Sequence, residues 1–360
     1  MSAQWTVQRT CLAALAAAAW TSTFPVAARR DVPARLSDAE FWTLSESLSE
    51  PSGYFRSDNL VSDELIFDRV MPALTRATRE GGTYLGVGPE QNFSYIAAIR
   101  PRMAFIVDIR RGNLHEHLLY KALFELSADR VDFVSRLFTK PRPAGLSAQS
   151  TAKALMDAFW NTPTSTQPAF DANLLAVNDV LIKRHGFALS KEDLDGIAYV
   201  YHSFYWFGLR ITWATSPRSQ AAGIPTFADL MRQSGTSGEG LSFLASEERF
   251  RVVKDLQSRN AIVPVIGNFA GPKALRAIGQ YLRDHDATVD VFYVDEVEPY
   301  LQHDGIWASF CENVAAMPLK ASSVFIRPAT KGFFNQPPAP AETAAPPLVT
   351  PIAPEVRNCR

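Results

Sequence analysis

The chain has 360 residues, of which 47% are hydrophobic and 20% charged, and its formal net charge is -1. This length and balance are typical of one large globular domain or two modest ones. A near-neutral charge without a long basic run gives no electrostatic basis for binding nucleic acid or an anionic membrane surface, so we expect neither as a partner.

Residues 1–28 have the features of a secretory signal peptide. Arg9 supplies a positive start, residues 11–20 form a short Ala- and Leu-rich core, and Val26-Ala27-Ala28 offers small residues for cleavage. We expect export to the periplasm or beyond the cell; the alternative is a cytoplasmic protein with an Ala-rich extension. No later segment has the length of a membrane span, so we expect no integral membrane segment after leader removal.

Residues 37–140 are predicted to form the first half of an α/β domain. Ser37 opens a capping box at the start of one helix, and Ser62 is expected to cap a second helix. Apolar strands are expected at 83–87 and 103–109, each followed by a helix. This strand–helix–strand–helix order indicates a parallel sheet with both faces covered.

Residues 141–245 are expected to form a mostly helical insertion, and residues 246–330 the second half of the α/β domain. Apolar, β-branched runs predict further strands at 261–267, 289–294 and 322–326. The fold class expected is therefore α/β, with a doubly wound, mostly parallel, Rossmann-like sheet interrupted by the helical insertion.

The last segment, residues 331–360, is rich in Pro and Ala and poor in large apolar side chains. Such a composition cannot bury enough surface to offset its ordering entropy, so a disordered tail is expected. The spacing of the three cysteines matches no zinc or redox motif. A disulfide between Cys311 and Cys359 is left open as a possibility.

The stretch TYLGVGPEQ is the strongest candidate for a ligand site. Gly86 and Gly88 follow a predicted strand, while Gln91 takes the place of the third glycine in the dinucleotide fingerprint. Asp108 ends the next strand, where a carboxylate can accept hydrogen bonds from both hydroxyls of a ribose. Two interpretations stay open: a nucleoside-type binding site, or a tight turn with Asp108 capping the following loop.

The segment around this turn resembles the nucleotide-binding half of class I S-adenosylmethionine-dependent methyltransferases. The residues that carry the resemblance are Gly86, Gly88 and Asp108. The resemblance implies a methyltransferase-like fold with S-adenosylmethionine as cofactor and Asp108 on its ribose. It also implies that Asn268-Phe269 in IVPVIGNFAG stands at the exit of the fourth strand, beside the transferred methyl group. Gln91, within the turn, is included in the cofactor site.

The sequence departs from that family at three points: Tyr84 replaces an acidic residue before the first glycine, Glu90 replaces a third glycine, and the prolines of the fourth-strand motif are absent. Longer stretches, LLYKALFELSADR and PVIGNFAGPKALRAIGQYLR among them, resemble a bacterial family of uncharacterised proteins with a methyltransferase-like fold. No reaction is implied by that second resemblance.

Four further residues are candidates for substrate contacts. Asp58 and Asn59 precede the first strand, where they either bind ligand hydroxyls or form a turn. His202 and Arg210 lie in an aromatic stretch that is either helix core or a lid over a ligand. His115-Glu116-His117 lacks metal-ligand spacing, and no metal site is expected.

The function expected is binding of a small, nucleoside-type molecule, with S-adenosylmethionine-dependent methyl transfer as the reaction. The alternative is a non-catalytic exported module that keeps this fold for binding or structure. S-adenosylmethionine is not expected to be plentiful outside the cytoplasm, so the leader and the cofactor point to different compartments. The sequence assigns no catalytic residue and no oligomeric state.

Overall fold

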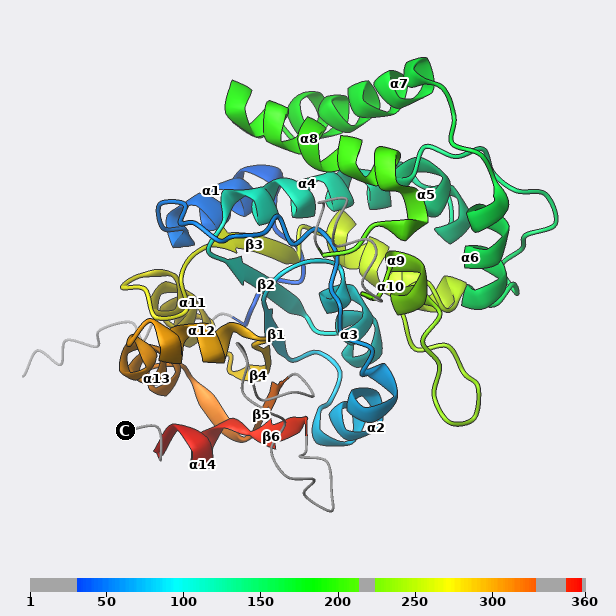
Figure 1. Cartoon of the computed structure of the whole chain (residues 1–360). Coiled ribbons are helices and arrows are strands. Elements are labelled where there is room, and N and C mark those ends of the chain that lie inside the picture. Colours follow the sequence, from blue (N-terminus) through cyan, green and yellow to red (C-terminus); the bar gives the residue numbers. More distant parts are fainter. Residues whose placement is uncertain (1–30, 214–223, 328–347, 358–360) are drawn as a thin grey trace, which may run out of the picture.

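A computed structural model describes residues 31–213, 224–327 and 348–357 (Figure 1). The described residues form a six-stranded sheet in the order β3-β2-β1-β4-β5-β6. Strands β1 to β5 are parallel and β6 pairs antiparallel with β5. The expected α/β class with a mostly parallel sheet is confirmed. The strands are β1 (Thr83–Gly86), β2 (Met103–Asp108), β3 (Ile262–Ile266), β4 (Val289–Tyr293), β5 (Leu319–Ile326) and β6 (Val349–Pro351).

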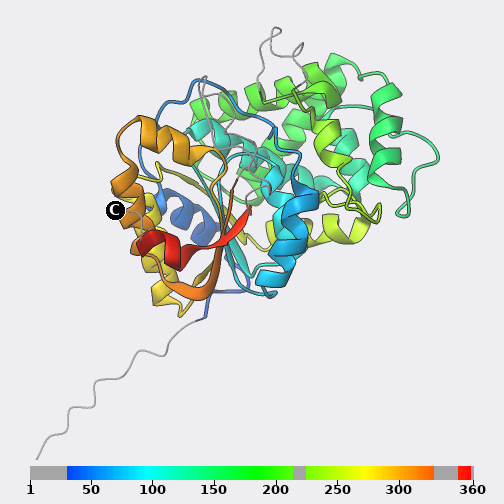
Figure 2. The ribbon, with the colours of Figure 1, turned by 60° about the horizontal axis from the view of Figure 1, so that its bottom comes forward.

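Helices cover both faces of the sheet (Figure 2). The strands are buried throughout β1 to β4, which explains their continuous apolar runs. One face carries α2 (Phe67–Ala77), α3 (Gln91–Ile99), α4 (Arg111–Leu126) and α10 (Glu247–Ser258), and the other carries α1 (Asp38–Leu48), α11 (Ala274–Asp284), α12 (Val297–His303) and α13 (Trp307–Ala315).

The segment between α4 and α10 forms a helical layer that packs on α4 and extends away from the sheet (Figure 1). Its longest helix, α8, begins with a capping box at Ser190. The layer consists of α5 (Arg130–Leu137), α6 (Ala152–Asn161), α7 (Gln167–Asn178) with the π-helical turn η1 (Asp179–Arg184), α8 (Lys191–Phe207) with the 3₁₀ turn η2 (Gly208–Arg210), and α9 (Phe227–Met231).

The first predicted cap is confirmed, and the second is wrong. Ser37 accepts from the N–H of Glu40 at the start of α1. Helix α2 begins at Phe67 instead of after Ser62. The Ser62 hydroxyl donates to the Gln91 side chain of α3. The hydroxyl that was predicted to cap α2 therefore makes a tertiary contact instead.

The expectation of a disordered tail is wrong for residues 348–357, which form β6 and α14 (Ile352–Arg357) against β5. Leu348 and Ile352 are buried there. A few apolar residues therefore suffice to order this segment, because it pairs with the edge of the sheet. Cys311 is disulfide-bonded. The other two cysteines and the predicted leader lie outside the described residues.

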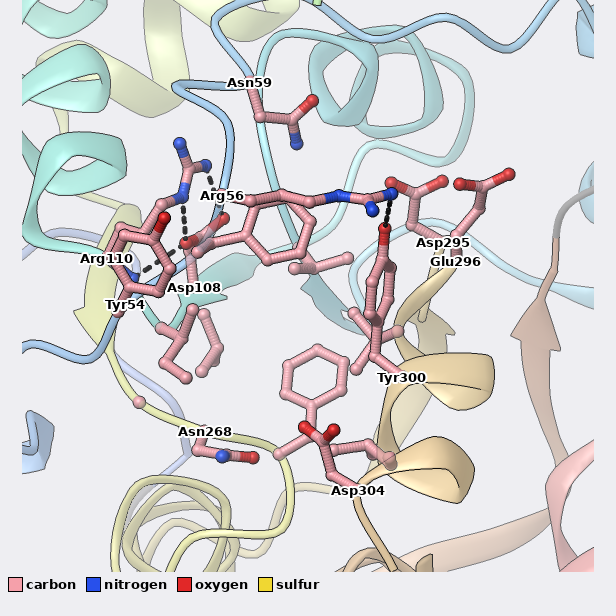
Figure 3. Close-up of a pocket in the computed structure, with 18 of the residues that line it drawn as sticks. Tyr54, Arg56, Asn59, Asp108, Arg110, Asn268, Asp295, Glu296, Tyr300 and Asp304 are labelled. Carbon is pink, nitrogen blue, oxygen red and sulfur yellow. Dashed lines mark hydrogen bonds and ion pairs between the residues drawn. The ribbon is translucent and has the colours of Figure 1, made fainter. Parts of the chain in front are cut away.

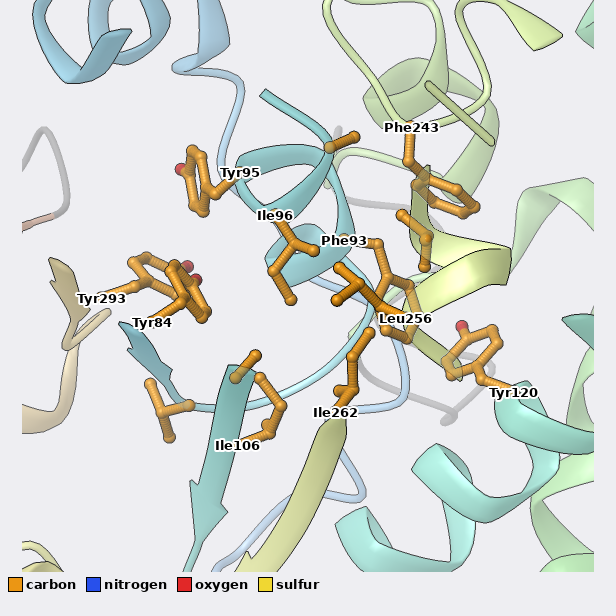
Figure 4. Packing of buried hydrophobic residues seen from close by; sticks show 14 of the residues in the cluster. Tyr84, Phe93, Tyr95, Ile96, Ile106, Tyr120, Phe243, Leu256, Ile262 and Tyr293 are labelled. Atoms are coloured by element: carbon orange, nitrogen blue, oxygen red, sulfur yellow. The ribbon is translucent and has the colours of Figure 1, made fainter. Parts of the chain in front are cut away.

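Aromatic side chains fix α3 between the sheet and its neighbours (Figure 4). The Phe93 ring packs edge-on to Tyr120 at 5.2 Å and to Phe243 at 5.5 Å between ring centroids. On the sheet side, Tyr95 contacts Tyr293 of β4 at 5.1 Å. This packing holds the turn between β1 and α3 in one place.

Candidate ligand-binding site

A pocket of about 490 Å³ opens at the carboxyl ends of β1, β2, β3 and β4 (Figure 3). A residue at or just beyond the end of each of these strands lines it: Val87, Asp108, Gly267 and Asp295. Strand order reverses between β1 and β4, and ligands of open parallel sheets bind at that point. The volume suits a small organic molecule.

Residues 49–63, which we call the strap, cross this edge of the sheet. The Glu50 N–H donates to the Ile266 carbonyl at 2.7 Å, and the Gly53 N–H to the Ile109 carbonyl at 2.8 Å. The strap then reaches α12, where Arg56 donates to the Tyr300 hydroxyl at 3.0 Å. It supplies five of the lining residues: Tyr54, Phe55, Arg56, Asn59 and Asp63.

The glycine turn is held from inside the protein. Gly88 has φ +74°, a conformation that favours glycine. Its carbonyl accepts from His117 Nε2 at 2.9 Å. Burial lowers the pKa of His117 to about 4, so the ring is neutral and uses its Nε2–H tautomer as donor. His117 of the His115-Glu116-His117 motif thus supports the turn, a role that the motif's spacing did not suggest.

Gly86 is needed for packing. A Cβ there would lie 1.9 Å from Asn92 Oδ1, which accepts from the Tyr84 hydroxyl at 2.8 Å. Tyr84, which stands where the methyltransferases have an acidic residue, is therefore part of the hydrogen-bond network inside the turn. Of the predicted cofactor residues, Gly86, Gly88 and Gln91 are not among those that line the pocket. Gln91 is instead bonded to Ser62 and, at 2.7 Å, to Tyr95.

Asp108 lines the pocket as predicted, but its carboxylate is already paired. Arg110 donates to Oδ1 from its backbone N–H at 2.9 Å and from Nε at 3.1 Å, and to Oδ2 from Nη2 at 3.0 Å. A carboxylate has about four lone-pair sites, so about one stays open. Asp108 can accept one further hydroxyl; accepting two requires Arg110 to move.

Arg110 also bonds the carbonyls of Ser57 and Asp58, which ties the strap to β2. Arg110 is not a solvated loop charge, because its side chain is only 11% exposed. Coulomb attraction from Asp108 and hydrogen bonding raise its pKa against the opposing effect of burial, so this cation is permanent.

Carboxyl groups gather on the β4 side of the pocket. Asp295 and Glu296 come just after β4, separated from it by Val294, and Asp63 approaches from the strap. Burial, reinforced by repulsion from Asp63, raises the pKa of Asp295 to about 7. Burial and repulsion from Asp295 raise the pKa of Glu296 to about 8. We call Asp63, Asp295 and Glu296 the acidic wall; Glu64, buried behind it, has its pKa raised to about 10 for the same reasons.

Asn268 and Phe269 line the pocket, but their strand is not the fourth. They follow β3, the third strand in chain order, which lies at the sheet edge beside β2. Phe269 contacts Phe292 of β4 at 5.0 Å between ring centroids. The strand on the other side of β1 is β4, and the acidic wall therefore occupies the place that the resemblance gave to Asn268.

The predicted substrate residues separate into two groups. Asn59 lines the pocket, whereas Asp58, His202 and Arg210 do not. The Asp58 carboxylate accepts from the Tyr199 hydroxyl at 2.6 Å. The Arg210 guanidinium lies 4.6 Å above the Trp160 ring, and His202 stacks on a neighbouring tryptophan in α8. The aromatic stretch is thus helical-layer packing, and its last residue, Trp213, is the one that reaches the pocket.

Sequence reasoning missed most of the aromatic and acidic lining. Tyr54, Phe55 and Tyr300 contribute rings to the pocket, with Phe55 and Tyr300 5.2 Å apart between centroids. Asp295 comes shortly after an apolar strand, and Asp108 ends one, so the sequence carried a similar signal for both. Within the described ranges, no group of three or more His, Cys, Asp or Glu side chains is arranged to hold a metal ion.

Fold and pocket together define an α/β protein with a pocket at the carboxyl ends of its parallel strands. The chain belongs to the family described as "Domain of unknown function (DUF7790)", whose model matches residues 60–203 and 207–347. None of the curated proteins compared with the chain matches it. Among the described helices, none is both long enough and apolar enough to cross a membrane.

Proposed function

We propose that the protein binds a small, nucleoside-type molecule in this pocket, and that S-adenosylmethionine is the first molecule to test. The observation that carries the proposal is the position of Asp108, at the end of the strand next to β1, on the wall of a pocket where strand order reverses. A carboxylate at that place suits a ribose hydroxyl.

The residues present fit S-adenosylmethionine in charge and size. The acidic wall suits a molecule with a sulfonium and an ammonium group, and Tyr54 and Phe55 offer rings beside which a base can lie. Asp108 can accept a hydrogen bond from one ribose hydroxyl, because Arg110 donates to the other lone pairs of its carboxylate. When bound, the cofactor supplies an electrophilic methyl group. The chain's contribution to such a transfer is positioning rather than acid–base chemistry.

Calorimetry with S-adenosylmethionine and S-adenosylhomocysteine tests the proposal. We expect saturable binding of both, tighter for the sulfonium because the homocysteine form lacks that charge. Asp108→Ala removes a hydrogen bond to a charged group, worth about 1.5–3 kcal/mol, and is expected to weaken binding about 10- to 100-fold. Asp171→Ala, at an exposed carboxylate on α7, is the matched control and should change nothing. Absence of heat from either ligand with a folded sample would refute the proposal.

The second candidate function is a non-catalytic exported module that uses the pocket for another ligand. The observation that favours it is the disulfide at Cys311, since disulfides persist in oxidising compartments outside the cytoplasm. S-adenosylmethionine is scarce there. Mass spectrometry of the protein from its native host distinguishes the two: an N-terminus near residue 29 supports export, and an intact leader supports a cytoplasmic enzyme.

A further inference from the structure

We propose that the acidic wall binds the protonated amine of an arylalkylamine, a small molecule with an aromatic ring and an alkylammonium group. This deepens the proposed function by naming a ligand class for the β4 side of the same pocket. It rests on the existence of that pocket, and it does not require S-adenosylmethionine to be the nucleoside-type ligand.

The acidic wall presents a buried oxygen atom that lacks a donor. Asp295 and Glu296 lie together at one end of the pocket, beside Tyr300 (Figure 3). Asp295 Oδ1 is buried and accepts no hydrogen bond from the described residues. An unpartnered buried acceptor on the pocket wall calls for a donor from outside the chain.

The charge of this cluster favours a cationic donor. When they are ionised, the carboxyl groups of Asp63, Glu64, Asp295 and Glu296 repel one another, and this repulsion contributes to the raised pKa of the last three. Arg56 partly offsets this repulsion at Glu296. An ammonium group brings three N–H donors and a positive charge. It therefore satisfies the buried oxygen and relieves the repulsion at once, which neither a neutral nor an anionic group does.

The neighbouring rings favour an organic cation with a ring of its own. Phe55 and Tyr300 lie at 77° to each other and line the pocket beside the wall. Aromatic faces attract organic ammonium groups, and edge-to-face pairs accommodate a further ring. An amine at the wall and a ring against Phe55 together describe an arylalkylamine.

Calorimetry and thermal shift with tyramine, and with N-acetyltyramine as its uncharged counterpart, test this inference on the full chain. We expect tyramine to bind at least tenfold more tightly. The double variant Asp295→Asn, Glu296→Gln should remove that preference while remaining folded, because it relieves repulsion in the free protein. Glu312 does not line the pocket, and its side chain is 72% exposed. The control variant Glu312→Gln therefore changes one charge outside the pocket and should keep the preference for tyramine.

Equal affinity for the two compounds, or a preference for tyramine that survives in the double variant, would overturn the inference. So would displacement of tyramine by Mg²⁺ at equal concentration, since the wall would then be a site for divalent cations. The result is separable from the proposed function. Tyramine binding without S-adenosylmethionine binding refutes the latter alone, and the reverse outcome refutes the amine site alone.

Discussion

Gly86→Ala is expected to lower the free energy of unfolding by about 3 kcal/mol, as overpacking of a tight interior does. The new methyl group would lie 1.9 Å from Asn92 Oδ1 and 2.7 Å from Tyr84 Cε1. Asn92 cannot move aside cheaply, because its amide also donates to the carbonyls of Val87 at 2.8 Å and Pro89 at 2.7 Å. Urea denaturation followed by circular dichroism measures the loss.

Gly112→Ala is the matched control. Gly112 lies in the first turn of α4, and a Cβ there meets nothing within 4 Å. Alanine has the higher helix propensity, so this variant should be unchanged or up to about 1 kcal/mol more stable. Equal stability of the two variants would contradict the conclusion that Gly86 is retained for packing in the turn.

The free energy of unfolding is expected to fall as pH rises from about 4.5 to about 8, with Glu90 as one cause. Burial raises the pKa of this fully buried carboxyl to about 8 from an ordinary 4.5. Between those values the native state binds a proton that the unfolded state has released, so raising the pH favours unfolding. A gap of this size is worth at most about 5 kcal/mol, at about 1.4 kcal/mol per pH unit.

Glu90→Gln removes the titration and keeps the shape. The variant should show a flatter pH dependence and exceed the wild type at pH 8 by about 3 kcal/mol, as measured by urea denaturation at several pH values. Glu312→Gln, at an exposed carboxylate, should keep the wild-type slope. A Glu90→Gln slope equal to that of the wild type would show that Glu90 is ionised in the folded protein.

The parallel strands were predictable because burial on both faces leaves continuous apolar runs, such as that of β2. Asp108 was placed on the pocket wall for the same reason, since the residue that ends such a strand emerges at the ligand edge. The coarse fold and the place of Asp108 therefore follow from local pattern alone.

The partners of these residues were not predictable. Arg110 pairs with Asp108 because the strap carbonyls of Ser57 and Asp58 fix its guanidinium, and nothing in the sequence shows where the strap runs. The assignment of Asn268 to the fourth strand, next to β1, was wrong. The chain enters β3 after the long helical layer, and the sequence does not show on which side of the sheet that strand is added. Asp63 joins the acidic wall across the pocket, through tertiary structure only.

The central claim is that a nucleoside-type molecule binds at the carboxyl ends of β1, β2 and β4. A crystal structure of the protein grown with saturating S-adenosylmethionine tests it most directly. The expected result is ligand density within the pocket, with a ribose hydroxyl in hydrogen-bond reach of Asp108. Density for the ligand at another surface, or ordered water alone between Asp108 and Asp295, would contradict the claim.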